Sequence, residues 1–412
     1  MDFIFDRIEA ERQKLNDTCE LIASENYPSA DVLRALGSVL SVKYAEGYPA
    51  NRHYAGCEIV DEVETYAVNA AKKLFGANYA NVQPWSGSQA NAAALYAFCA
   101  AGDVILSLDL NEGAHLTHGS PFTFSGKYFH HESFHLGADE KIDYEVIRRR
   151  VAETNPRLLI AGTSAYPLSI DFAKIREIID EHNSRATANS RPQTIFMADM
   201  AHIAGLVAAG EHQSPAPYAD VITSTSHKTL RGPRGGFILW NDEAFAKKIN
   251  QAVFPAIQGG PNEAAIAAKA VCFDEAMRPS FKEYIRAVKS NMTQMLKGIK
   301  ETAPSIRFVA GGSETHLGML DLKPIGLCGA EAERMLTDIN IITNKNMIAG
   351  DAAPSKSTGL RIGSAAMTTR NLSADEFRRV GNIIGLCLVR GADGAALKSE
   401  IAEILRRYPI YL

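Results

Sequence analysis

The strongest constraint on the fold is a series of short apolar runs that alternate with helix-like segments between about residues 58 and 240. Short apolar runs separated by helices of about ten residues are typical of a parallel sheet covered on both faces. The sequence therefore predicts an α/β protein with a mainly parallel sheet flanked by helices. The expected strands are Tyr79–Gln83, Val104–Leu108, Leu158–Ala161, Ile195–Ala198, Val221–Thr223 and Phe237–Trp240, and the expected helices include Glu58–Phe75, Ser86–Cys99, Asp143–Ala152 and Phe172–His182.

The remainder of the chain predicts a second, smaller domain. A long helical stretch at about 263–302 contains Pro279 and is expected to break there. An α+β region with strands near Leu317–Asp321 and Gly359–Ile362 follows it. We expect residues 1–270 to form an N-terminal segment plus a large cofactor-binding domain, and residues 271–412 to form the small C-terminal domain. The polar segment 183–193 is predicted to be a surface loop.

The composition argues against several classes of function. The chain of 412 residues has a formal net charge of −4, so it lacks the basic surface typical of nucleic-acid binding. No segment has the roughly 18 apolar residues of a membrane helix, and no signal peptide is expected. The six cysteines are scattered, which favours a cytoplasmic protein without disulfides or zinc. His130, His131 and His135 accompany an alternating run, so a strand is expected there rather than a metal site.

The carboxyl ends of the strands are where open α/β sheets bind ligands, so reactive residues are sought there. The segment Trp85–Gln89 places Ser86, Gly87 and Ser88 at the start of a helix. Hydroxyl groups and backbone N–H groups at a helix N-terminus favour a phosphate. The same residues are also typical of an ordinary helix cap, so this motif is weak when taken alone.

Two further strand ends carry an acid and an amine. Asp199 either forms an ion pair with a structural arginine or holds the protonated pyridine nitrogen of pyridoxal 5′-phosphate (PLP). Lys228 is either a surface charge or an amine that forms a Schiff base next to His227. A turn rich in glycine and proline can return Arg234 toward the lysine. A phosphate cradle, an acid and a lysine on one parallel sheet together indicate a PLP enzyme.

The ordered motifs closely resemble the serine hydroxymethyltransferase family from about residue 12 to 390. The matching segments are 21–26 (LIASEN), 43–49 (KYAEGYP), 79–84 (YANVQP), 115–119 (HLTHG), 199–202 (DMAH), 227–230 (HKTL), 253–255 (VFP), 258–261 (QGGP) and 361–363 (RIG). The resemblance implies the fold type I architecture of PLP-dependent transferases. It also implies an enzyme that interconverts serine plus tetrahydrofolate and glycine plus 5,10-methylenetetrahydrofolate.

The resemblance implies roles for individual residues. Lys228 would bind PLP covalently, Asp199 would pair with its pyridine nitrogen and His115 would stack on its ring. The implied cofactor-binding residues are Ser86, Gly87, Ser88, His115, Asp199, His202, Arg234, Gly259 and Gly260. The implied catalytic residues are Lys228, His227, Glu46, Tyr44 and Tyr54, the substrate carboxylate would lie on Ser24 and Arg361, and the folate on Leu116 and Asn346. As in the obligate homodimer of the family, Gly259, Gly260, Glu46, Tyr44 and Tyr54 would act in the active site of the partner subunit.

Several positions depart from the usual family pattern. They are Trp85 and His53, Ala114 and Ala256, the loop Met347–Thr358, which is about one residue shorter and lacks the Ser-Pro-Phe of the family, and the run Gly363-Ser364-Ala365-Ala366. None of these departures changes Lys228, Asp199, His115 or Arg361. The departures are compatible with drift within the family. They also leave open a paralogue that works without folate, as an aldolase or transaldolase of β-hydroxy amino acids or as a transferase of a 2-methylserine type.

Overall fold

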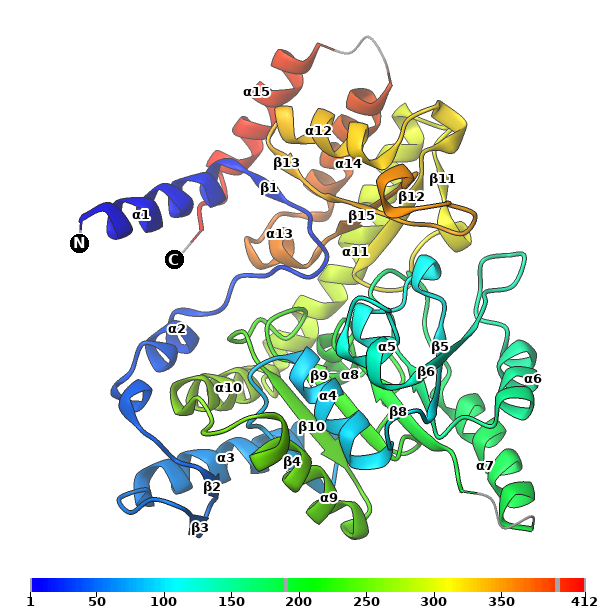
Figure 1. The fold of residues 1–412 in the computed structure, drawn as a ribbon. Helices are drawn as coiled ribbons and strands as arrows, with labels where there is room; N and C mark the ends of the chain where they lie inside the picture. Colours follow the sequence, from blue (N-terminus) through cyan, green and yellow to red (C-terminus); the bar gives the residue numbers. More distant parts are fainter. Residues whose placement is uncertain (1, 189–191, 390–392, 411–412) are drawn as a thin grey trace. The chain divides into compact units, whose positions relative to one another are not determined.

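The structure of the protein is a computed structural model that describes residues 2–188, 192–389 and 393–410 (Figure 1). The chain forms two compact units. The larger unit contains residues 31–164 and 169–282, and the smaller unit contains residues 1–30, 165–168 and 283–412. Each unit has its own sheet and its own hydrophobic core.

In the described part of the chain, the larger unit is built on a seven-stranded sheet of order β4-β10-β9-β8-β7-β5-β6. Neighbouring strands from β9 to β6 run parallel, whereas β10 is antiparallel to both β9 and β4. The prediction of a mainly parallel sheet is therefore confirmed. The strands are β4 (Tyr79–Asn81), β5 (Val104–Leu108), β6 (His130–Phe134), β7 (Leu158–Ala161), β8 (Ile195–Asp199), β9 (Val221–Thr225) and β10 (Gly236–Trp240).

Helices flank this sheet, as the hydrophobic pattern predicts (Figure 1). The alanine-rich helix α4 packs against β9 and β10, because its small buried side chains allow the helix to approach the strands closely. Helix α3 packs along α10, and its last turn ends at Gly76 in the left-handed conformation expected of a C-cap. The helices are α2 (Ala30–Leu36), α3 (Glu58–Phe75), α4 (Gly87–Phe98), α5 (Phe124–Tyr128), α6 (Tyr144–Thr154), α7 (Phe172–Ala188), α8 (Ala204–Ala209), α9 (Ala246–Gln251) and α10 (Glu263–Ala276).

The predicted loop at 183–193 is wrong in its first half, because α7 continues through Ala188. Asn183 explains part of the difference: its side chain donates to the carbonyl of Thr194 and accepts from the Thr194 N–H. Arg185 also forms an ion pair with Glu181 one turn earlier. These contacts satisfy polar residues within a helix, which the local composition does not reveal. Residues 189–191 of the predicted loop lie outside the described part of the chain.

The smaller unit packs helices against an antiparallel sheet of order β11-β12-β15-β14. The long helix α11, which belongs to this unit from residue 283 onward, begins at Pro279 directly after α10, so the predicted break is confirmed. Proline suits the first turn of a helix because the N–H that it lacks has no partner there. The elements are β11 (Arg307–Phe308), β12 (Leu317–Asp321), β14 (Asn344–Asn346), β15 (Gly359–Gly363), α11 (Pro279–Thr302), α12 (Gly329–Asp338), α13 (Ala365–Thr369), α14 (Ala374–Leu388) and α15 (Gly394–Arg406).

The N-terminal residues belong to this smaller unit. Helix α1 (Asp2–Asp17) leads into β1 (Cys19–Glu20), which pairs in parallel with β13 (Ile341–Ile342). The buried guanidinium of Arg370 donates to the backbone carbonyls of Leu15, Asn16 and Thr18. The compact units thus differ from the expected domains 1–270 and 271–412. The N-terminal segment joins the C-terminal unit through these contacts, and α10 stays with the large unit because it packs on α3.

None of the described helices is long and apolar enough to cross a lipid bilayer. All six cysteines are free thiols. Across residues 2–188, 192–389 and 393–410, no group of three or more His, Cys, Asp or Glu side chains is arranged to hold a metal ion. His130 and His131 lie on strand β6 as expected, where His130 contacts Glu132 and His131 contacts Ser107.

Candidate active site

The carboxyl ends of β8 and β9 bring three of the predicted site residues into one region of the larger unit. Asp199 is the last residue of β8, which pairs in parallel with β9. Beyond the strand ends, the hydroxyl of Thr229 donates to the carbonyl of His202 at 2.9 Å. Thr229 directly follows Lys228 in the chain. The two exit segments are therefore bonded to each other, and Asp199, His202 and Lys228 lie in one region of the larger unit.

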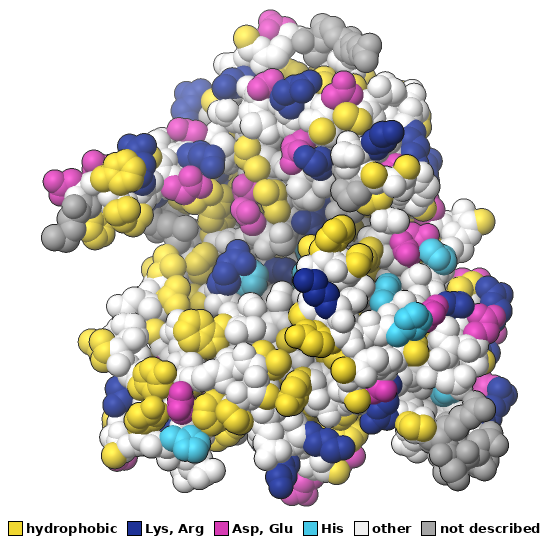
Figure 2. Space-filling view, in the orientation of Figure 1, with side chains coloured by type: hydrophobic (Ala, Val, Ile, Leu, Met, Phe, Trp, Pro, Cys, Tyr) yellow, Lys and Arg dark blue, Asp and Glu magenta, His cyan; other side chains and the backbone are white. Residues whose placement is uncertain are grey.

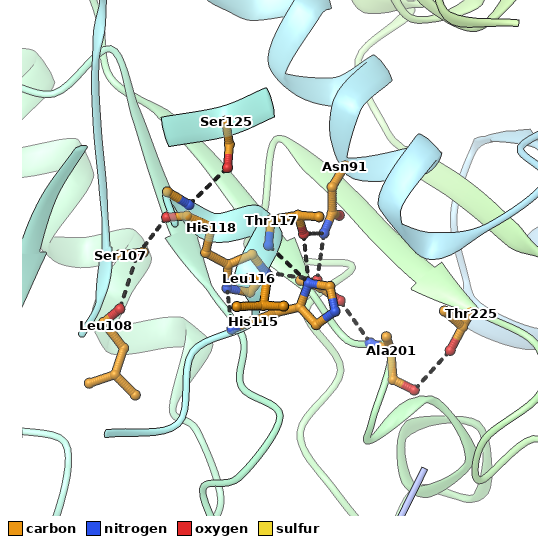
Figure 3. A network of polar contacts seen from close by, with 12 residues as sticks. Asn91, Ser107, Leu108, His115, Leu116, Thr117, His118, Ser125, Ala201 and Thr225 are labelled. Atoms are coloured by element: carbon orange, nitrogen blue, oxygen red, sulfur yellow. Dashed lines mark hydrogen bonds and ion pairs between the residues drawn. The ribbon is translucent and has the colours of Figure 1, made fainter. Parts of the chain in front are cut away.

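Asp199 is the centre of a buried polar network. Its donor residues Asn91, His118 and Ala201 are labelled in Figure 3. One of its carboxylate oxygens accepts from His118 Nε2 at 2.8 Å and from Asn91 Nδ2 at 2.9 Å. The other oxygen accepts from the backbone N–H of Ala201 at 3.0 Å. Within the described residues, no arginine or lysine forms an ion pair with Asp199. The alternative of a structural arginine partner therefore has no support in the structure.

The surroundings keep Asp199 ionised. Burial raises the pKa of a carboxyl group, but the hydrogen bond from His118 and the effects of His118, His115 and Lys228 outweigh it. The pKa of Asp199 is therefore well below its usual range. A carboxylate only accepts hydrogen bonds, and it has about four lone-pair positions, of which the contacts above use three. Asp199 is thus able to accept one more N–H, such as that of a protonated pyridine nitrogen.

His115 is bonded to the same network. Its Nδ1 lies 2.7 Å from the hydroxyl of Thr117 and accepts from the Thr117 N–H at 3.2 Å. The hydroxyl of Thr117 in turn accepts from Asn91 (Figure 3). Asn91 also donates to Asp199. Asn91 thus joins the residue expected to stack on the cofactor ring to the residue expected to pair with its nitrogen.

Lys228 and His227 follow β9. Lys228 is buried, with 9% of its surface exposed, so it is not the surface charge that a lysine after a strand often is. Burial and, to a smaller extent, the positive charges of Lys228 and Arg234 together lower the pKa of His227 to about 3. Gly235 N–H lies 3.5 Å from Nδ1 of this uncharged ring. Arg234 is therefore close to the lysine segment, as the turn of glycine and proline predicts.

Helix α4 begins next to this region. Ser86 caps the helix, and its hydroxyl accepts from the Gln89 N–H, so the interpretation as a helix cap is correct. The backbone N–H groups of Gly87 and Ser88 have no partner among the described residues, so they remain able to bind an anion. A Cβ atom at Gly87 would lie 2.6 Å from Cγ2 of Thr225, the last residue of β9. The start of α4 therefore contacts the strand that leads to Lys228.

The residues present fit PLP. The ionised acid suits the pyridine nitrogen of that cofactor, and the buried amine suits its aldehyde. The helix N-terminus, with its unpaired N–H groups, suits its phosphate. All three parts lie in the larger unit and on one sheet.

Comparison with known proteins agrees with this chemistry. A family profile described as "Serine hydroxymethyltransferase" matches residues 2–384. The chain belongs to the serine hydroxymethyltransferase family. Proteins named serine hydroxymethyltransferase from Lacticaseibacillus casei (strain BL23) and Lacticaseibacillus paracasei (strain ATCC 334) are each 46% identical to it over 414 positions, which cover 99% of this chain and 98% of each relative. The family and the fold type I α/β architecture expected from the sequence are confirmed.

A second set of residues that the serine hydroxymethyltransferase resemblance singles out gathers elsewhere in the larger unit. The rings of Tyr44 and Tyr54 pack edge to face, with 5.2 Å between their centres. A Cβ atom at Gly260 would lie 3.5 Å from Tyr44 and 3.6 Å from Glu46, and one at Gly259 would lie 3.4 Å from Glu46. The five residues expected to act across a subunit interface are therefore grouped within one chain.

Arg52 and Gln83 hold the backbone beside Glu46. The guanidinium of Arg52 donates to the carbonyls of Ala45 and Gly47, and the amide of Gln83 donates to Gly47 as well. Both side chains also bond the buried carboxylate of Glu64, at 2.6 Å from Arg52 and 2.8 Å from Gln83. The position of Glu46 thus depends on buried residues to which no local sequence pattern assigns a role.

Three further candidates of the family pattern lie in the smaller unit: Arg361, Ser24 and Asn346. Arg361 is on β15, opposite Asn344 of β14, and its Nε donates to the Asn344 side chain at 3.1 Å. Burial lowers the pKa of Arg361 to about 10, which leaves it charged near neutral pH. Ser24 follows Ala23, which packs closely on Gly363. A Cβ atom at Gly363 would lie 2.4 Å from the Ala23 backbone. Asn346 ends β14.

The structure also shows the surroundings of Leu116 and of most residues that differ from the usual family pattern. Leu116 and Trp85 are both exposed. The ring of His53 lies 5.5 Å from that of Phe254, between centres. Ala365 and Ala366 are buried in α13, and the hydroxyl of Ser364 donates to the carbonyl of Val288. Ser364 and the two alanines thus pack within the smaller unit.

Proposed function

We propose that this chain, as a serine hydroxymethyltransferase, interconverts serine plus tetrahydrofolate and glycine plus 5,10-methylenetetrahydrofolate with PLP bound covalently to Lys228. The observation that carries the proposal is the buried Asp199 carboxylate with its three donors, one strand away from Lys228, in a chain of this family. When bound, PLP supplies an electron sink for the bonding electrons of the substrate α-carbon.

The protein residues hold and orient the reacting groups in this proposal. Asp199 keeps a proton on the pyridine nitrogen, because an ionised carboxylate favours the protonated ring. His115 stacks on the ring, and His202 and Arg234 contact the cofactor beside Lys228. Ser86, Gly87 and Ser88 bind the phosphate, since a helix N-terminus favours an anion.

The substrate contacts in the proposal are those that the family pattern assigns. Arg361 binds the carboxylate of the amino acid as a bidentate pair, with Ser24 beside it. Glu46 gives or takes the proton of the substrate hydroxyl, with Tyr44 and Tyr54 next to it. The neutral ring of His227 accompanies Lys228 without adding a charge. Leu116 and Asn346 contact the folate.

We further propose a homodimer in which Glu46, Tyr44, Tyr54, Gly259 and Gly260 serve the partner's site. Exposed hydrophobic side chains support this, because large exposed apolar patches are typical of interfaces. They gather over the region of α2, α3 and the hairpin of β2 (Gly47–Tyr48) and β3 (Asn51–Arg52), as Figure 2 shows. The residues are Leu33, Leu36, Val39, Val42, Tyr44, Tyr54 and Ile59.

The six free thiols accord with the predicted cytoplasmic location.

A mixture of two inactive variants tests the shared site. Glu46→Gln and Lys228→Ala homodimers should both be inactive, whereas a mixed dimer carries one site with both wild-type residues. Random reassembly of equal amounts makes half of the dimers mixed, so about one quarter of wild-type serine turnover should return. No recovery, with mixed dimers verified by mass spectrometry, would place Glu46 in the site of its own subunit.

The function itself is tested by serine turnover with and without tetrahydrofolate. We expect rapid formation of glycine from serine only when PLP and tetrahydrofolate are both present. Cleavage of allo-threonine serves as the control reaction, since it needs no folate acceptor. Brisk turnover that does not respond to tetrahydrofolate would contradict the transferase and favour the folate-independent aldolase.

A further inference from the structure

Lys269 of α10 is a buried lysine whose amine is bonded only to backbone carbonyl groups, and burial lowers the pKa of that amine to about 7. Its Nζ donates to the carbonyl of Val82 at 2.6 Å, of Pro84 at 3.0 Å and of Gly236 at 2.9 Å. One per cent of its surface is exposed. An ammonium has three N–H donors, so each has its own acceptor. Among the described residues, no carboxylate lies within ion-pair distance of Nζ.

A buried charge without a carboxylate partner is costly, so a packing role alone does not explain this lysine. A leucine or methionine of similar volume would fill the same space between α10 and the sheet without that cost. Three matched acceptors instead suggest that the ammonium fixes the chain segments to which those carbonyls belong.

The three carbonyls belong to the two segments that frame the cofactor in the proposed function. Val82 and Pro84 lead from β4 into the start of α4 at Trp85–Ser88, which we call the phosphate loop. Gly236 begins β10 and ends the turn that follows Lys228. The Gly236 N–H donates to the same Pro84 carbonyl at 3.0 Å. Lys269 thus bonds the phosphate loop to the segment that carries Lys228.

The glycines around Lys269 leave little freedom for another arrangement. A Cβ atom at Gly235 would lie 2.3 Å from Cε of Lys269, and one at Gly236 would lie 2.3 Å from the Ser86 carbonyl oxygen. Either distance is far shorter than an ordinary contact between carbon and its neighbours. The lysine stem, the turn and the phosphate loop therefore pack in direct contact, and displacement of one is transmitted to the others.

We infer that Lys269 is a positioning residue that sets the phosphate loop relative to Lys228, so that the protein prefers phosphorylated to unphosphorylated pyridoxal. This inference rests on the proposed function. It concerns a residue that touches neither the cofactor nor the substrate. A purely structural lysine would affect the stability of the fold without changing the preference for the phosphate group.

The test measures the affinities of the full chain, freed of cofactor, for PLP and for pyridoxal in wild type and in Lys269→Met. Methionine keeps the volume of the lysine stem but removes all three donors. We expect the dissociation constant for PLP to rise about tenfold or more, the range for hydrogen bonds to a charged group, while that for pyridoxal changes little. If Lys269→Met does not fold, the same ratio is measured in Lys269→Gln, which retains one donor group and should show a smaller loss.

Arg370→Met is the matched control. Arg370 is also a buried cation bonded to backbone carbonyls, but all of these belong to the smaller unit. Its loss should lower the melting temperature and leave the ratio of the two affinities unchanged. A folded Lys269 variant that retains the wild-type ratio overturns the inference. Failure of the wild-type chain to bind PLP would instead overturn the proposed function.

Discussion

Lys228→Ala is expected to lower serine turnover by roughly a thousandfold or more, a loss of about 4 kcal/mol of transition-state stabilisation. The reason is that Lys228 is the buried amine at the end of β9, and PLP has no other covalent attachment in the proposed site. The variant should also lose the absorbance band of PLP held as a Schiff base on lysine. Steady-state kinetics and an absorbance spectrum of the purified protein measure both effects.

Lys247→Ala provides the control for this prediction. Lys247 is an exposed lysine on α9 of the same unit, so its removal takes away an amine without disturbing the sheet. It should retain wild-type turnover and spectrum. Near-normal turnover in Lys228→Ala, with a normal melting temperature, would show that Lys228 is not the attachment residue.

Asp199→Ala is expected to have the second-largest effect. Removal of one partner from a buried charge pair costs about 3–5 kcal/mol, which corresponds to roughly two to four powers of ten in turnover. PLP should still attach to Lys228 in this variant, because the amine is unchanged. Serine turnover and borohydride-fixed PLP, measured on the same preparation, separate the two effects. The role given to Asp199 would be contradicted if some Asp199→Ala molecules lose their attached PLP while those that keep PLP turn over serine at the wild-type rate.

The pH dependence of Asp199 follows from its lowered pKa. The ionised form stabilises the folded state fully above the unfolded pKa of about 3.9, and this contribution is lost only as the pH falls through the lower folded value. The turnover of wild type between about pH 5 and 9 should therefore show no titration of Asp199.

His118→Ala removes the donor to Asp199 and should lower turnover less than Asp199→Ala does, because Asn91 and Ala201 still donate to the carboxylate.

Much of the sheet and the centre of the site could be predicted from the sequence. The apolar runs that became β5, β7, β8 and β9 are visible because strands buried on both faces read as continuous hydrophobic segments. The strand ends then point to Asp199 and Lys228, since parallel strands present their carboxyl ends at one edge. The family resemblance supplied the residues of the segments at 44–54 and 258–261, which no local pattern indicates.

The supporting residues could not be predicted, because their roles arise from tertiary contacts. His118 lies in a segment used for the resemblance, yet only the fold brings its ring to Asp199. Asn91 did leave a signal, since a polar residue within an alanine-rich buried helix needs a partner. In the sequence, Lys269 does not differ from any other lysine of a helix. Only its three backbone acceptors in the structure distinguish it. The pairing of β1 with β13 likewise joins residues more than three hundred positions apart.

The central claim, that PLP is attached to Lys228 beside Asp199, is tested most directly by mapping the attachment site. Borohydride reduction of the PLP-loaded protein turns the reversible bond between amine and cofactor into a stable one, which peptide mass spectrometry then locates. The account predicts a single pyridoxyl label on the peptide that contains Lys228, with Lys269 unlabelled. A label on another lysine, or no label on a folded protein saturated with PLP, would contradict it.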